Sequence, residues 1–345
     1  MARRSRRREH ERDMTAFDAV HAISVRRGVA LVALLAAACG SGTRTASPAS
    51  VPTTTVTQVS GASATVRSQS STTPARPTGS RGVCGNPGLA PRRYASVVVF
   101  AFENRSWSDV GVGFGSGMPY LHRLGRRCSY FTDWTETDTT QNSLTQYVGQ
   151  VTGAFQPGAV NDCSPSATCS TDANSIFRQA RRAGLRAVNY VEGAKTRCSA
   201  AGNAARHVPV LYLWGAHDRA HCGAQVRPLR ELDPDALPSF AFVTPNLCHD
   251  GHDCADSVVD RWAAAHVQPV LDSDAYRAGR VAVFIWYDED RPVPNMWITP
   301  TAKAGAVTKP GAGYAGTLEA WESMLGLRCL ADACTAPNMR ARANS

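Results

Sequence analysis

The chain has 345 residues, of which 43% are hydrophobic, and its 37 Lys and Arg against 28 Asp and Glu give a formal net charge of +9. The ordinary hydrophobicity and the lack of a Gly-X-Y or heptad repeat exclude a disordered or fibrous protein. No apolar run reaches the ~20 residues of a spanning helix, which excludes a multi-pass membrane protein. Residues 1–38 and 39–83 carry +4 each, so the rest of the chain carries only +1. We therefore expect no nucleic-acid partner.

Residues 1–38 are typical of an export signal. Arg26 and Arg27 precede an apolar run of 11 residues, 28–38, which leads directly to Cys39. This order resembles a bacterial lipobox and predicts that Cys39 is lipidated and becomes the first mature residue. A plain signal peptide with an incidental cysteine is the alternative, the arginine pair also fits twin-arginine export, and Met14 is a second candidate start. We expect an exported protein, anchored by lipid on the extracytoplasmic face of the cell membrane.

Residues 39–83 are predicted to form a disordered tether. The 44 residues from 40 to 83 include 19 Ser or Thr and four Pro, with no aromatic residue. Such a segment has too little apolar surface to form a core, and it behaves as a flexible linker. The folded domain is accordingly predicted over residues 84–345.

Ten cysteines remain after Cys39, and an even number in an exported chain predicts disulfides. Short spacings indicate the pairs Cys163–Cys169, Cys248–Cys254 and Cys329–Cys334. The other four cysteines allow more than one pairing, and we expect Cys84–Cys128 and Cys198–Cys222. A cysteine metal site is disfavoured, because no CxxC pair occurs.

About 260 residues remain for the domain, which suits one α/β unit. Short apolar runs predict buried strands, and amphipathic stretches between them predict helices. The expected strands are 94–102, 187–191, 239–244, 281–287 and 296–299. The expected helices are 119–127, 143–152, 173–183, 257–271 and 317–325. This alternation predicts a mostly parallel central sheet with helices on both faces, stapled by disulfides.

Polar side chains follow three of the predicted strands. The first strand runs into Glu103 and Asn104, another into Asn246 and residues 249–253, and a third into residues 288–290, which are Asp-Glu-Asp. Ligands of open α/β sheets bind beyond the carboxyl ends of the strands. Carboxylate, amide and imidazole groups at one sheet edge suit a divalent cation. The alternative is that these residues only form turns and helix caps.

Ser143 is a candidate nucleophile, because it begins a predicted amphipathic helix. A hydroxyl there lies at the positive end of the helix dipole, beside backbone N–H groups that can hold a phosphate oxygen. The alternative is that Asn142 or Ser143 simply caps the helix.

The order of motifs resembles the bacterial acid phosphatase and phospholipase C phosphoesterases of the alkaline phosphatase superfamily. The pieces that carry the resemblance are FENRSW at 102–107, NSLTQYVGQVTG at 142–153, NYVEG at 189–193, RHVPVLY at 206–212, TPNLCHDGHDC at 244–254 and WYDED at 286–290. The resemblance implies an alkaline-phosphatase-like fold and phosphoryl transfer with one divalent metal ion of unknown identity. It also implies a covalent phosphoserine intermediate.

The resemblance assigns roles to individual residues. The implied metal ligands are Glu103, Asn104, Asp288, Glu289 and the nucleophile Ser143. The implied phosphate-contacting or proton-donating residues are His207 and His252, with Asp250 as a further site residue. Gln146 and Asn246 are the implied substrate-binding residues.

Departures from the family pattern lie around the nucleophile. Both prolines that usually flank it are absent, Gln146 stands where Asn is usual, and Val208 replaces an Asn. The expected activity is a metal-dependent phosphomonoesterase, with a phosphate ester as substrate, the membrane as partner through the lipid anchor, and a monomeric state. The alternatives are a phospholipase C acting on phosphodiester headgroups and an inactive relative that binds phosphorylated ligands. His217 and His221 are predicted to lie in a disulfide-pinned loop, not in a metal site.

Overall fold

A computed structural model describes residues 82–86, 91–111, 117–135, 142–200, 202–289, 292–307 and 311–344, all within the unit Ala75–Ser345. The predicted export signal, Cys39 and the tether as far as residue 81 lie outside the described residues, as does Asp290. Among the described helices, none combines the length and the apolar character needed to cross a membrane.

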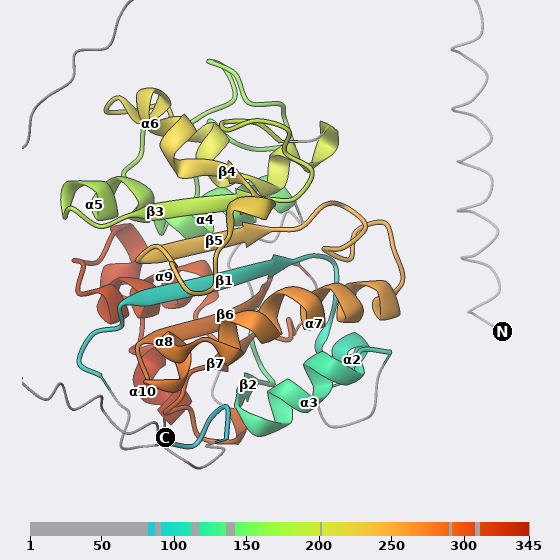
Figure 1. The fold of residues 1–345 in the computed structure, drawn as a ribbon. Helices are drawn as coiled ribbons and strands as arrows, with labels where there is room; N and C mark the ends of the chain where they lie inside the picture. The colour runs from blue at the N-terminus through green and yellow to red at the C-terminus, as the bar shows by residue number, and fades with distance from the viewer. Residues whose placement is uncertain are drawn as a thin grey trace, which may run out of the picture. The chain divides into compact units, whose positions relative to one another are not determined.

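Eight strands form one sheet in the order β4-β3-β5-β1-β6-β7-β2-β8 (Figure 1). Their bounds are β1 Ser96–Phe102, β2 Ser129–Phe131, β3 Ala187–Val191, β4 Val226–Pro228, β5 Phe240–Thr244, β6 Val281–Tyr287, β7 Met296–Ile298 and β8 Gly305–Val307. All of the described pairings are parallel except those of β7, which runs antiparallel to β6 and β2. The predicted mostly parallel sheet is confirmed.

The central strands are buried along their whole length. Every residue of β1, β5 and β6 is buried, and each strand is an almost continuous run of apolar side chains. A strand covered on both faces needs such a run instead of an alternating pattern. Helices therefore have to cover both faces of this sheet.

Helices cover the sheet on both sides, as predicted. The α-helices are α2 Trp107–Val110, α3 Pro119–Arg127, α4 Ser143–Thr152, α5 Ile176–Arg182, α6 Asp218–Gln225, α7 Asp256–Asp272, α8 Asp274–Arg277, α9 Gly313–Leu325 and α10 Met339–Asn344. Short 3-10 helices are η2 Gly202–His207, η3 Pro209–Tyr212, η4 Leu229–Glu231 and η5 Ala331–Cys334. In Figure 1, α7 crosses in front of the central strands, while α4 and α9 lie behind them. The fold class predicted from the sequence is confirmed.

Five disulfides form, and all are expected pairs: Cys163–Cys169, Cys248–Cys254 and Cys329–Cys334, which the spacings indicated, and Cys84–Cys128 and Cys198–Cys222, for which another pairing was possible. The Cys198–Cys222 bridge pins α6, so the predicted loop is wrong in part: His221 lies within this helix and His217 directly precedes it. Beside it, the buried carboxylate of Asp218 accepts hydrogen bonds from Arg178 and Arg181 at 3.0 Å each. Neither histidine joins a group that could hold a metal ion, as far as the described residues go.

Candidate active site

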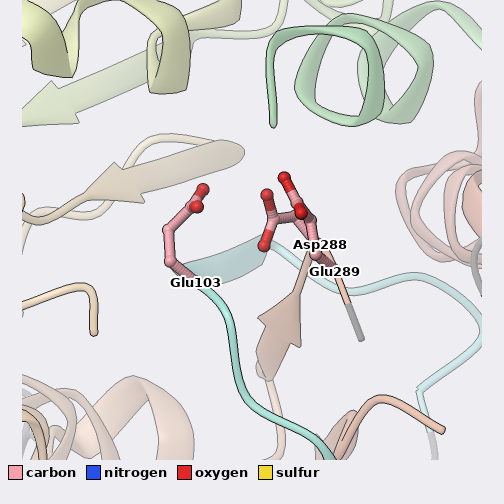
Figure 2. A group of neighbouring side chains, drawn as sticks. All are labelled: Glu103, Asp288 and Glu289. Atoms are coloured by element: carbon pink, nitrogen blue, oxygen red, sulfur yellow. The ribbon is translucent and has the colours of Figure 1, made fainter. Parts of the chain in front are cut away.

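Three carboxylates meet at the carboxyl ends of two neighbouring strands. Glu103 directly follows β1, and Asp288 and Glu289 directly follow β6. The two strands pair in parallel with Phe102 opposite Tyr287, so Glu103 and Asp288 leave the sheet side by side. Figure 2 shows the three carboxyl groups facing one another across a gap, and one oxygen of each lies within 4.8 Å of the others. Two of the three strand ends predicted to share one site thus meet here.

Burial raises the pKa of carboxyl groups in this cluster. Glu103 and Asp288 are fully buried, and burial, followed by the neighbouring carboxylates, raises the pKa of both well above the ordinary range. Both oxygens of Asp288 and Oε1 of Glu103 have no hydrogen bond of normal geometry. Buried oxygens without donors are costly, and three close carboxylates repel when ionised. A divalent cation with oxygen ligands would remove both penalties, so these residues fit a metal ion.

Ser143, the first residue of α4, completes the cluster. Its Oγ atom lies 3.0 Å from Oε2 of Glu103 and 3.0 Å from Oε1 of Glu289. The side chain is buried, with 4% exposed. A hydroxyl has one hydrogen to donate, so it can satisfy only one of these carboxylates at a time. The predicted nucleophile and three of its predicted companion ligands are thus in contact.

The N-terminus of α4 is capped by a residue that the sequence did not indicate. Oδ1 of Asp162 accepts the backbone N–H of Leu144 at 3.0 Å, and the backbone N–H of Asp162 donates to Oδ1 of Asn142 at 3.2 Å. The side chain of Asn142 accepts no capping bond from the helix backbone. The expectation that the first helix N–H groups are open to phosphate therefore needs correction, because Asp162 occupies the N–H next to Ser143.

His207 lies against the carboxylate cluster. Its ring is fully buried, with Nδ1 3.0 Å from Oδ2 of Asp250 and Nε2 3.2 Å from Oε1 of Glu103. The ring stacks on Tyr147 with centroids 5.0 Å apart. Burial lowers the pKa of His207, and the hydrogen bond to Asp250 opposes that shift. The imidazole is thus oriented by Asp250 toward the acidic cluster.

The loop after β5 is tied to the strand end that carries Glu103. The carbonyl of Asp250 accepts the backbone N–H of Glu103 at 2.8 Å, and Oδ1 of Asp250 accepts the N–H of His252 at the same distance. Gly251 has φ 110°, and a Cβ there would lie 2.8 Å from the carbonyl oxygen of Glu103. Only glycine allows this approach. The Cys248–Cys254 disulfide closes the loop.

Arg206 is a site residue that the sequence reasoning missed. Its Nε donates to Nε2 of His207 at 3.1 Å, and its Nη2 donates to Nε2 of His252 at 2.8 Å. Because arginine has no acceptor, both imidazoles present a lone pair at Nε2. Nδ1 of His252 lies 2.6 Å from Oδ1 of Asp253. The signal in the sequence was the Arg-His pair itself, at 206–207.

Three predicted site residues remain: Asn246, Gln146 and Asn104. Oδ1 of Asn246 accepts the N–H groups of Cys248 and His249 at 3.0 Å each, which is the bonding of a turn. Gln146 is buried on α4, one turn beyond Ser143. Asn104 follows Glu103 with φ 50°, and its backbone interacts with the carboxylate of Asp288. Their predicted roles as substrate and metal ligands stay predictions.

A second pair of polar side chains supports the loop from outside the cluster. Oε1 and Oε2 of Glu192, just after β3, lie 2.9 and 3.0 Å from Nδ1 of His249. Oε2 of Glu192 also accepts the backbone N–H of Asn246 at 2.9 Å. Glu192 thus anchors the start of the loop that carries Asp250 and His252.

Sequence comparison finds two similar proteins that are named as phosphatases. No protein-family model matches the chain. The chain is 25% identical over 255 residues to the phosphatidylinositol-3-phosphatase of Mycobacterium tuberculosis, a match that covers 71% of this chain and 81% of that protein. It is 30% identical over 60 residues to a protein of Kluyveromyces lactis named "Probable acid phosphatase", where it covers 17% of this chain and only 14% of the yeast protein.

Two solved structures share the fold. An alkaline phosphatase superfamily protein from Vibrio parahaemolyticus superposes with a TM-score of 0.52 at 12% identity, covering 74% of this chain and 72% of that one. The lipoteichoic acid synthase LtaP from Listeria monocytogenes gives 0.51 at 11% identity, covering 72% and 76%. These matches confirm the alkaline-phosphatase-like fold that the resemblance implied.

Proposed function

We propose that this chain is a metal-dependent phosphoric ester hydrolase that acts on phosphomonoesters through a phosphoserine at Ser143. The observation that carries the proposal is the position of the Ser143 hydroxyl, 3.0 Å from carboxylates on two different strand ends. The similarity to two proteins named as phosphatases supports it. Since one of them is named for an inositol lipid, a lipid phosphomonoester is a substrate class to include in tests.

The metal-binding part of the proposal rests on Glu103, Asp288 and Glu289. A divalent cation bound there would neutralise the carboxylates and lower the pKa of the nearby hydroxyl. Asn104 follows Glu103 and is proposed as a further ligand. The raised pKa values of Glu103 and Asp288 belong to the cluster without such a countercharge.

In the proposed reaction, Oγ of Ser143 attacks phosphorus while the bond from phosphorus to the ester oxygen breaks. The hydroxyl proton passes to Glu103 or Glu289, both of which lie at 3.0 Å. We assign protonation of the departing alkoxide to His252, whose side chain is 33% exposed. To act as the acid, Nε2 of His252 must first release the Arg206 hydrogen bond and take a proton from solvent. Water then cleaves the phosphoserine and regenerates Ser143. His207, held by Asp250, orients the site.

The proposed location is the extracytoplasmic face of the membrane, with lipid on Cys39. The five disulfides of the folded unit support an oxidising compartment, because such bonds are rare in the cytosol. Mass spectrometry of the membrane fraction tests this, since the Cys39→Ser variant should lose the lipid mass and the membrane association. An unchanged membrane fraction for that variant would remove the anchor from the proposal.

The decisive experiment compares p-nitrophenyl phosphate with p-nitrophenyl phosphocholine, each with and without chelator. We expect chelator-sensitive monoester turnover that Ser143→Ala abolishes. Ser175→Ala is the matched control, because Ser175 is also a buried serine at a helix N-terminus, that of α5. A preference for the diester would establish the phospholipase C alternative. Absent turnover with retained phosphate binding would establish the inactive relative.

A further inference from the structure

We propose that Arg206 binds the phosphoryl oxygens that face away from the carboxylate cluster, and that it makes the site favour dianionic monoesters over diesters. This inference rests on the proposed function. It adds that the same site selects substrates by the charge of their phosphoryl group. It begins from the unusual partners of the Arg206 side chain.

The guanidinium of Arg206 is largely buried, and its hydrogen bonds go to neutral acceptors. Its side chain is 15% exposed, and its two hydrogen bonds go to the Nε2 atoms of His207 and His252. Oδ2 of Asp162 forms an ion pair with Nε of Arg206 at 3.7 Å, which is too long for a hydrogen bond. Hydrogen bonds between two ionised groups are roughly twice as strong as neutral ones. The guanidinium would therefore gain by exchanging an imidazole for an anionic oxygen.

Arg206 stands at the right distance from the reaction centre. Nε2 of His207 lies 3.1 Å from Nε of Arg206 and 3.2 Å from Oε1 of Glu103. Since the two contacts share one nitrogen, the guanidinium Nε cannot be more than about 6 Å from the carboxylate cluster. A phosphoryl group that meets the cluster with one oxygen can reach a donor at this separation with another. Such a charge clamp is the arrangement that stabilises phosphoryl transfer.

The backbone N–H at the start of α4, which could otherwise bind a phosphate oxygen, already has an acceptor. Oδ1 of Asp162 holds the backbone N–H of Leu144, next to Ser143. In the described part of the chain, Arg206 hydrogen-bonds both His207 and His252, and its guanidinium is permanently charged. Arginine presents parallel N–H groups that match two oxygens of one phosphate, which a lysine ammonium does not.

Substrate charge follows from this placement. A monoester dianion has three non-bridging oxygens, so it can offer one to the cluster and still give two to the Arg206 fork. A diester has only two non-bridging oxygens and one negative charge. A bound diester must therefore leave one N–H group of the Arg206 guanidinium without an acceptor. A buried donor without a hydrogen bond costs free energy. The loss of Arg206 should therefore reduce monoester turnover more than diester turnover.

The test uses the full-length oxidised protein and two substrates with the same leaving group, p-nitrophenyl phosphate and bis(p-nitrophenyl) phosphate. Arg206→Gln should lower kcat/KM for the monoester by about 10³-fold, and for the diester by much less. Arg206→Lys should fall between the wild type and Arg206→Gln. Guanidinium ion should restore part of the monoester activity of Arg206→Ala. Arg181→Gln is the matched control, because Arg181 is 24% exposed and binds Asp218.

Calorimetry with inorganic phosphate, in the presence of divalent metal, separates this inference from the proposed function. Phosphate binding that Arg206→Gln weakens at least tenfold supports the inference, even in a protein without turnover. Equal loss of both activities with unchanged phosphate affinity would mean that Arg206 only orients the two histidines, and would overturn it. If Arg206→Gln fails to fold, the Arg206→Lys comparison and the guanidinium rescue decide, and failure of both overturns it. A wild type that neither turns over nor binds phosphate overturns both proposals.

Discussion

Asp162 accepts the backbone N–H of Leu144 across 3.0 Å, although the two residues are 18 positions apart in the chain. This bond satisfies one of the free donors at the start of α4, where a helix has no internal partner for its first N–H groups. It also fixes the backbone immediately after Ser143. The same hydrogen bond therefore caps α4 and fixes the position of Ser143, the proposed nucleophile.

Removal of the cap should weaken both stability and turnover. Asp162→Ala should cost about 1 kcal/mol of unfolding free energy, the usual value of a lost N-terminal cap. It should also lower kcat, because the first turn of α4 carries Ser143, while Asp162→Asn keeps an acceptor and most of the activity. Ser175→Ala removes the cap of α5 and should cost similar stability without loss of kcat. Equal kcat in the two Ala variants would disprove the link.

Metal binding should be visible in stability without any substrate. The metal-free protein holds buried carboxylates that repel one another, and a ligand at 100 times its Kd stabilises the folded state by about 2.7 kcal/mol. Added divalent metal should therefore raise the Tm of the wild type. Asp288→Asn should raise the Tm of the chelated protein and remove most of the response to metal. A full metal response in this variant would exclude Asp288 as a ligand.

Stability should fall as the pH rises from about 4.5 to 8 because of Glu322. Burial raises the pKa of this α9 carboxyl to about 8, so the folded protein keeps a proton that the unfolded chain releases above its ordinary pKa of 4.5. The contribution is complete below 4.5 and lost above 8. Glu322→Gln should therefore stabilise the protein more at pH 8 than at pH 5. Thermal unfolding at both values, with the exposed Asp274→Asn as control, measures it.

The long-range disulfide should contribute more than the short ones. Cys84 and Cys128 are separated by 44 residues, whereas Cys163 and Cys169 are separated by 6. Loop-closure entropy gives about 4 kcal/mol for the first bridge and about 2 kcal/mol for the second. Urea unfolding of the two double alanine variants should show this order. Equal losses would mean that native contacts, and not the unfolded chain, set the contribution.

The central strands could be predicted because burial leaves a strong pattern. β1 and β6 are apolar throughout, and a buried parallel strand has to be. β2, β4 and β8 have three residues each and were not predicted, whereas β7, which is equally short, was predicted from its apolar run at 296–299. α9 begins at Gly313, four residues before the predicted start, because tertiary packing there overrides the low helix propensity of glycine.

The candidate site, like the fold, could be predicted only in part. Glu103 and Asp288 could be placed together because each directly follows a strand, and neighbouring parallel strands end at one edge. The roles of Asp162 and Arg206 could not be predicted, because they depend on loop paths. Arg206 meets His252 across 46 positions of the chain, and no local pattern records such a contact. Backbone periodicity locates strand ends, but it does not locate the loops that return to them.

Selective loss of the Cys248–Cys254 bridge should act on the candidate site before it acts on the fold. Cys248 and Cys254 close a covalent ring that contains both Asp250 and His252, whereas the sheet beneath is held by its buried strands. Asp250 and His252 thus lie in a small covalent ring at the carboxyl edge of the sheet. Breaking this one bridge would then free the loop that carries both groups in a molecule that is still folded.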